Sequence, residues 1–208
     1  MGVGGALCLT VTARRRFGNR RYILHPSHNP TMATEKHASG AWAPVFAPRT
    51  AGEIRYWLMK SEPDTFSFTD LEKAPRKTTT WDGVRNFVAR NFLRDGMKRG
   101  DQVFFYHSST KPQAIVGVCE VAKEAYPDAS AFDPNHDGYD EKSDREDPTW
   151  FAVDLKAVGP LARPVTLAEL KANKELANMA MLRIGRLSVT PVTKKEWETI
   201  RSMAESPA

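Results

Sequence analysis

The chain has 208 residues, a formal net charge of +5 and two cysteines, Cys8 and Cys119. This length fits one domain with an extension, and no apolar run approaches the roughly 18–20 residues of a membrane-spanning helix. A membrane-embedded protein is therefore not expected. Two cysteines this far apart also exclude a disulfide-built fold, and the strand pattern around Cys119 predicts a buried free thiol.

The positive charge is concentrated at the beginning of the chain. Residues 1–52 contain seven Lys or Arg and one acidic residue, Glu35. The whole chain has 30 basic and 25 acidic residues, so residues 53–208 have 23 and 24. A domain this close to neutrality must bind any nucleic acid through local groups and not through its bulk charge.

Residues 1–52 are expected to form a disordered basic extension, because they lack hydrophobic periodicity and are rich in Pro, Ala, Ser and Thr from residue 25 onward. Two interpretations remain open. An Arg-rich start without acids is typical of an organelle transit peptide. Alternatively, the start codon was assigned too early, and Met32 begins the protein. The folded domain is then expected over 53–203, followed by a tail at 204–208.

The first elements of the domain follow from local patterns. Residues 54–59 predict a strand because they are rich in β-formers. Ser67 or Thr69 is suited to cap a short helix over 69–74. A longer helix is expected over 83–96, with Asp82 as its cap. Its inward face would carry Val84, Phe87, Val88 and Phe92, and Gly96 would end it.

Strands dominate the middle of the chain and helices follow. Strands are predicted at 102–107 and 113–124, and the turn-forming "SSTKPQ" between them indicates an antiparallel hairpin. A polar loop over 127–148 precedes a strand at 149–161. The end carries a helix within 164–176 after Thr166, a short strand after residue 186, and a helix whose capping box is Thr193 with Glu196. The order predicts an α+β fold, a small mixed barrel with helices packed outside.

Catalytic motifs are absent, so no catalytic residue, metal or cofactor is expected. His107 and Ser108 are neighbours on a strand and would point to opposite faces, which argues against a catalytic pair. The loop 133–144 has acidic residues at calcium-loop spacing, but Pro134 and Asp144 depart from the pattern. A solvated acidic loop is the favoured interpretation.

The stretch around Trp81 is the strongest local signal of binding. A Trp before a turn can stack on a planar ligand, and free backbone amides with Arg85 beside them favour an anion. A ring beside an anion site suits a nucleotide. Trp197, on the last helix, is instead expected to pack in the core.

Several longer motifs occur in order along residues 53–203: "YWLMKSEPDTFSFTDL", "TTTWDGVRNFVARN", "QVFFYHS", "PTWFAVDL" and "RLSVTPVTKKEW". In combination they resemble the EVE domain family. The resemblance implies an α+β, PUA-like mixed β pseudo-barrel with peripheral helices. It also implies a non-enzymatic reader of a modified nucleobase in DNA, of the 5-methylcytosine or 5-hydroxymethylcytosine type. The base would be flipped into an aromatic pocket.

The pocket residues that the resemblance implies come from four motifs: Trp57, Lys60 and Ser61; Trp81, Gly83, Val84, Arg85 and Asn86; Tyr106, His107 and Ser108; and Arg186, Leu187 and Ser188. Trp81 or Tyr106 would stack on the base, and Ser61, Asn86 and Ser188 would bond to its edge. Arg85, Arg186 and Lys60 would hold phosphate or a carbonyl oxygen. Val84 or Leu187 would line a niche for a methyl group.

Three alternatives remain open: an RNA-binding PUA-like module, a small-molecule or nucleotide sensor, and an ASCH-like hydrolase on the same fold. The expected partner is DNA with modified cytosine, or RNA in the first alternative. The protein is expected to be a monomer and to have no membrane partner. The expected location is the bacterial cytoplasm, in association with the nucleoid, or the nucleus of a eukaryote. A mitochondrial location requires the Arg-rich leader to be genuine.

Overall fold

The computed structural model describes residues 40–206; residues 1–39 and 207–208, with Cys8 and most of the predicted extension, lie outside the described part. Within it, one mixed six-stranded sheet has the order β2-β5-β4-β3-β1-β6. The strands are β1 (Tyr56–Ser61), β2 (Thr78–Trp81), β3 (Gln102–His107), β4 (Ala114–Pro127), β5 (Phe151–Thr166) and β6 (Val189–Val192). Only β1 and β3 pair in parallel.

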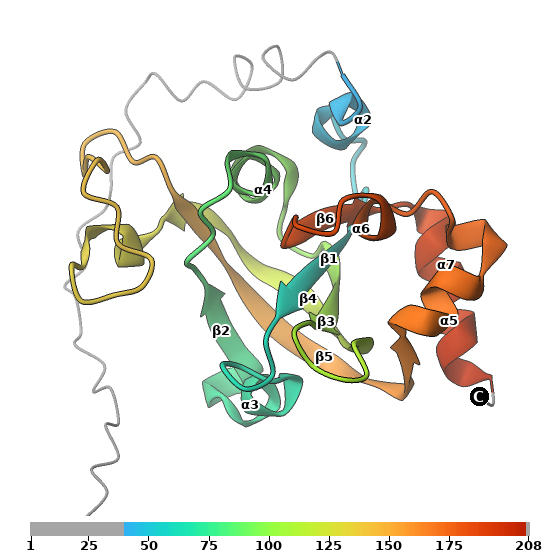
Figure 1. Ribbon diagram of the computed structural model, residues 1–208. Coiled ribbons are helices and arrows are strands. Elements are labelled where there is room, and N and C mark those ends of the chain that lie inside the picture. The colour runs from blue at the N-terminus through green and yellow to red at the C-terminus, as the bar shows by residue number, and fades with distance from the viewer. Residues whose placement is uncertain (1–39, 207–208) are drawn as a thin grey trace, which may run out of the picture.

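Short helices surround the sheet (Figure 1). The α-helices are α2 (Ala43–Phe46), α3 (Phe68–Lys73), α4 (Phe87–Asn91), α5 (Leu167–Ala172), α6 (Ala180–Arg183) and α7 (Lys194–Glu205). Single turns of 3-10 helix are η1 (Pro75–Lys77), η3 (Ala129–Phe132) and η4 (Lys174–Leu176), and η2 (Phe92–Gly96) is a π-helix. The predicted α+β class, a mixed β pseudo-barrel with peripheral helices, is confirmed.

The alternation of side chains along β1 and β3 divides the core between the two faces of the sheet. Trp57 and Phe105 belong to one cluster, which α3, α4 and η2 cover. Leu58 and Phe104 belong to the other, which α5 and α7 cover. Trp197 stacks on Phe104 at 3.9 Å between ring centroids, so its predicted packing role is confirmed. Cys119 is a buried free thiol, also as predicted.

The elements that local signals specify most strongly form where they were expected. The hairpin of β3 and β4 is antiparallel, and β3 has the predicted bounds. Capping boxes begin α3 at Ser67, α5 at Thr166 and α7 at Thr193. In each box, the hydroxyl of the capping residue accepts a hydrogen bond from the backbone N–H three residues later. The acidic side chain of that later residue accepts from the backbone N–H of the capping residue. β2 and α6 were not predicted.

The prediction for residues 83–96 was partly wrong. The helix begins at Phe87, because the Asn86 side chain accepts hydrogen bonds from the N–H groups of Val88 and Ala89 at 2.9 and 3.1 Å. Asp82 therefore does not cap it. The buried face is Ala89, Phe92, Leu93 and Gly96, whereas Phe87 and Val88 are 60% and 39% exposed. The later start and the π-helix rotate the apolar stripe away from the expected one.

The prediction of disorder was wrong for residues 40–52. Trp42 and Phe46 pack against Phe92 at 5.3 and 5.7 Å between ring centroids. Arg49 pairs with the buried carboxylate of Asp101 at 2.5 Å and donates to the Gly96 carbonyl at 2.6 Å. Two rings and one cation are too few to create a sequence pattern, but they fix this segment on η2. At the other end, α7 continues to Glu205, beyond the predicted boundary at 203.

Candidate nucleic-acid-binding site

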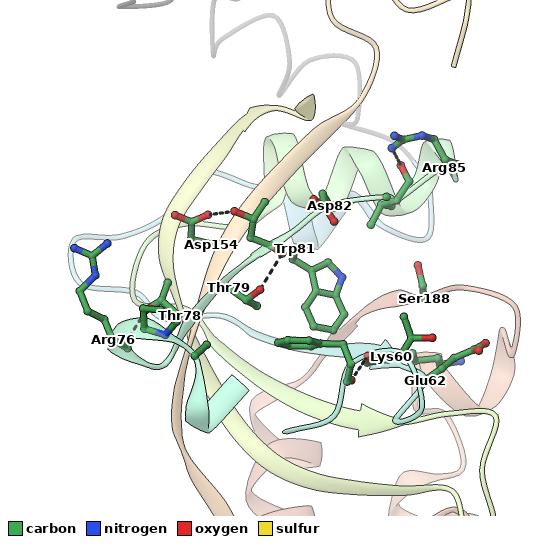
Figure 2. Close-up of a pocket in the computed structure, with 18 residues that line it drawn as sticks. Lys60, Glu62, Arg76, Thr78, Thr79, Trp81, Asp82, Arg85, Asp154 and Ser188 are labelled. Carbon is green, nitrogen blue, oxygen red and sulfur yellow. Dashed lines mark hydrogen bonds between the residues drawn. The ribbon is translucent and has the colours of Figure 1, made fainter. Parts of the chain in front are cut away.

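A cavity of about 1020 Å³ lies where the sheet fails to close. β2 and β6 are the two edges of the sheet. β2 forms one wall of the cavity, and the end of β1 with Ser188, just before β6, forms the facing wall (Figure 2). The lining residues are Lys60, Ser61, Glu62, Thr65, Phe66, Ala74, Pro75, Arg76, Thr78, Thr79, Thr80, Trp81, Asp82, Gly83, Val84, Arg85, Asp154 and Ser188. We call it the seam cavity.

Trp81 supplies the aromatic surface of the seam cavity. It ends β2, and its ring meets Phe105 edge to face at 5.5 Å between centroids. Its indole lies between β2 and the wall that carries Lys60 and Ser188 (Figure 2). The ring is partly buried, so the core holds it in place while part of it remains accessible. Such a ring can stack on a planar ligand.

Asp82 is a carboxylate of the seam cavity that other side chains leave uncommitted. Glu62 accepts from Ser109 at 2.8 Å, and Asp154 accepts from Thr80 at 3.2 Å and from Tyr126. Within residues 40–206, no other side chain donates a hydrogen bond to Asp82. Burial raises its pKa, and the negative charge of Asp128 raises it further. A carboxylate in this setting is available to accept from the amino group of a ligand.

Arg85 anchors the wall that follows Trp81. Its guanidinium donates to the fully buried carboxylate of Asp128 at 2.7 Å, to Ser130 at 2.9 Å and to the Gly138 carbonyl at 2.6 Å. The same carboxylate accepts from the N–H of Gly83 at 3.0 Å. Burial alone would raise the pKa of Asp128, but the hydrogen bonds from Arg85 and Ser130 outweigh it and lower the pKa. The guanidinium is thus engaged by protein groups of the cavity wall, and the predicted role of Arg85 in holding phosphate or a carbonyl oxygen of a ligand stays a prediction.

A second, smaller cavity of about 480 Å³ adjoins the seam cavity and shares Lys60, Glu62 and Ser188 with it. Its other lining residues are Tyr106, Ser108, Ser109, Gln113, Leu167, Lys171, Met181, Leu182, Gly185 and Arg186. Burial raises the pKa of Tyr106 to about 12 and keeps the hydroxyl neutral. Lys60 stands between the two spaces, where its ammonium donates to the Gly185 carbonyl at 2.8 Å and burial lowers its pKa.

The structure thus divides the fourteen predicted site residues. The seam cavity brings together Lys60, Ser61, Trp81, Gly83, Val84, Arg85 and Ser188, and the smaller cavity adds Tyr106, Ser108 and Arg186. The remaining ones line neither space: Trp57, Asn86, His107 and Leu187.

Each of these four has a structural role. The fully buried Trp57 donates to Asp101 at 2.8 Å, and Asn86 caps α4. Burial lowers the pKa of His107, and its Nε2 accepts from the N–H of Phe68 at 3.1 Å. Leu187 is buried in the core.

Sequence reasoning missed Asp82 as a lining residue because an Asp before an apolar helix pattern is typical of an N-cap. It missed Asp154 because only the pairing of β2 with β5 sets this residue opposite Thr80. It missed Glu62, which follows β1, because only the folded sheet brings the end of β1 to the cavity that Trp81 lines. The run Thr78–Thr80 was a usable signal, since consecutive β-branched residues favour a strand.

Over residues 40–206, no group of three or more His, Cys, Asp or Glu is placed to hold a metal ion. The loop 133–144 closes instead on its own turns, as where Asp133 accepts from the N–H of Asn135 at 3.0 Å. No helix in this part of the chain is long and apolar enough to cross a membrane.

Comparison with known proteins identifies close relatives. The model of the EVE domain matches residues 55–203. Thymocyte nuclear protein 1 of the mouse is 42% identical in an alignment of 210 positions that covers 93% of this chain and 92% of that protein. The human protein is 42% identical over 72% of this chain and 74% of its own length.

Solved structures share the fold. Human THYN1 protein in complex with DNA containing 5-methylcytosine has a TM-score of 0.72 and 41% identity, covering 74% of this chain and 99% of that one. A hypothetical protein from Leishmania major has a TM-score of 0.71 and 46% identity, covering 75% and 98%.

Proposed function

Since the chain belongs to the EVE domain family, we propose that it is a non-enzymatic reader that binds a modified cytosine in DNA, with the base flipped out of the duplex into the seam cavity. The observation that carries this proposal is the seam cavity itself. It places an accessible indole, Trp81, next to an uncommitted carboxylate, Asp82, in an open space. Its volume is at the upper end of the roughly 300–1,000 Å³ of small-molecule sites.

Stacking on Trp81 provides the affinity. A base that leaves the duplex loses the stacking of its neighbours, and an aromatic side chain replaces it with about 1–3 kcal/mol per base. The edge-to-face contact with Phe105 holds the indole in one orientation, so little side-chain entropy is lost on binding.

Asp82 provides the selectivity for cytosine over thymine. The exocyclic amino group of cytosine is a donor that a carboxylate accepts, whereas thymine has a carbonyl oxygen at the same position. Asp82 would therefore attract cytosine and repel thymine. The apolar side chain of Val84 also lines the cavity and is suited to contact a methyl group on the base.

The human relative supports the ligand class, because it was crystallised with DNA that contains 5-methylcytosine. The vertebrate relatives are named as nuclear proteins, which supports a nuclear location for this chain. Binding without catalysis is supported by the hydrogen bonds that already engage His107 and Ser108, the two candidate catalytic residues. His107 accepts from a backbone N–H, and Ser108 donates to the Ser61 carbonyl at 3.2 Å.

The test is the affinity of the full chain for short duplexes that differ at one position, with cytosine, 5-methylcytosine or 5-hydroxymethylcytosine. We expect tighter binding to a modified base than to cytosine, and loss of this preference in Trp81→Ala. Equal weak binding to all three would contradict the proposal. Tighter binding to the matching methylated RNA would favour the RNA-binding module, and equal binding of the free nucleoside would favour a sensor.

A further inference from the structure

Two large apolar side chains project into solvent from the first turn of α4. Phe87 is 60% exposed and Val88 is 39% exposed. Among the exposed large hydrophobic residues of the described chain, these are the two that follow one another in sequence. Because exposed apolar area is unfavourable in water, a pair of such residues indicates contact with another molecule.

This apolar pair lies at the rim of the seam cavity. Val84 and Arg85 line the cavity, and α4 begins two residues later. Phe87 lies 5.0 Å from the Trp150 ring, and the guanidinium of Arg85 lies 5.4 Å from the same ring. Arg90 lies 5.0 Å from the Phe87 ring. Trp150 and Arg90 therefore hold Phe87 in a fixed direction and leave much of it open to solvent.

The charges near the cavities indicate what kind of molecule meets this rim. Arg76 lines the seam cavity, Arg186 lines the smaller one, and Arg183 ends α6 three residues before Arg186. All three are exposed, and within residues 40–206 none of them forms an ion pair with a carboxylate. Unpaired guanidinium groups around the two cavities, together with an apolar projection, are complementary to a polyanion with an apolar interior, such as a nucleic-acid duplex.

We propose that Phe87, with Val88 beside it, enters the base stack of the duplex and fills the gap that the flipped base leaves. The inference rests on the proposed function, because a gap exists only when a base is extruded. Unstacking a base step costs a few kcal/mol, and apolar wedges in DNA-bending proteins compensate it by inserting between bases. The phenyl ring replaces the lost stacking while the base occupies the seam cavity.

The experiment compares the affinity of the full chain for a duplex with one 5-methylcytosine and for the same methylated strand alone. Phe87→Ser is expected to weaken duplex binding roughly 10- to 100-fold and to leave single-strand binding unchanged, because a single strand has no gap to fill. Phe87→Leu keeps an apolar side chain and is expected to lose less than about tenfold. Val158→Ser is the matched control, since Val158 is 57% exposed on β5 and lines neither cavity.

Two results would overturn the wedge alone: duplex binding by Phe87→Ser that equals wild type, or an equal loss on duplex and single strand, which indicates a purely structural role. A wild-type chain that binds methylated and unmethylated duplexes equally would overturn the proposed function, and the wedge with it. A thermal unfolding curve of Phe87→Ser shows that the variant is folded under the binding conditions.

Discussion

The ion pair between Arg85 and Asp128 is expected to stabilise both the fold and the cavity wall, and Asp128→Asn tests this. The Asp128 side chain is fully buried and accepts from Arg85 at 2.7 Å, Gly83 at 3.0 Å, and Ser130 twice, at 2.7 and 2.9 Å. An amide of the same shape keeps one acceptor oxygen but turns an NH₂ group toward donors and removes the charge that balances Arg85. Breaking a buried pair in this way costs about 3–5 kcal/mol.

The measurement is the free energy of unfolding from urea titration at pH 7. Glu124→Gln is the matched control, because it breaks the exposed pair with Lys98, whose side chains are 46% and 48% accessible, and should cost at most about 1 kcal/mol. Asp128→Asn should also weaken binding of the methylated duplex, since the N–H of Gly83 loses its acceptor at the cavity wall. A cost of less than about 1 kcal/mol for Asp128→Asn would refute the reasoning, because it would show that the pair is not energetically coupled to the fold.

The same pair predicts the direction of a pH effect. The pKa of Asp128 is lowered in the folded protein, so its contribution to stability is present above the unfolded value of about 3.9 and is lost as the pH falls through the folded pKa. Wild type should therefore lose stability below about pH 4 more steeply than Asp128→Asn. Parallel curves for the two proteins would contradict this assignment.

Three further predictions concern the cavity and the N-terminal segment. Trp81→Ala should weaken binding of the methylated duplex by about 1–3 kcal/mol, and Trp81→Phe should retain most of the affinity, as measured by fluorescence anisotropy. Asp82→Asn should weaken binding of the methylated duplex by a similar 1–3 kcal/mol, because the amide turns a donor toward the amino group of the base. Arg49→Ala should cost about 1.5–3 kcal/mol in urea titration, because the buried Asp101 loses its cationic partner; an unchanged stability would mean that residues 40–52 do not contribute to the fold.

The sequence was a good guide to several elements that depend on near neighbours. The capping boxes at Ser67, Thr166 and Thr193 each involve a residue three positions away, and all three formed. The hairpin of β3 and β4 depends on two adjacent apolar runs and the turn between them. Local hydrogen bonds and side-chain alternation fix such elements before any distant contact is made.

Long-range contacts account for much of what the sequence did not predict. β2 is a four-residue edge strand whose only ladder is with β5, more than 70 residues later, so nothing near it indicates its partner. The role of Arg85 depends on Asp128 and Gly138 in a loop more than 40 residues away. A cation near a Trp is typical of a phosphate site, and nothing near Arg85 in the sequence indicates that its guanidinium also pairs with the buried carboxylate of Asp128.

The candidate site contains one residue whose location agrees with the sequence-based expectation, Trp81, and one whose location does not, Phe87. The neighbours of Trp81 predict a residue that can stack on a ligand, and Trp81 lines the seam cavity; its stacking role stays a prediction. Phe87 was expected to face inward because the apolar pattern was taken to begin at Val84, but the Asn86 cap delays the helix and exposes the ring. One capping residue thus decides whether an aromatic side chain belongs to the core or to the rim of a binding site.

The most direct test of the central claim is a crystal structure of the full chain bound to a duplex with one 5-methylcytosine. The account predicts that the methylated base lies outside the duplex, stacked on Trp81 in the seam cavity, with its amino group within hydrogen-bonding distance of Asp82. A methylated base that remains stacked and paired within the duplex, with the seam cavity empty, would contradict it.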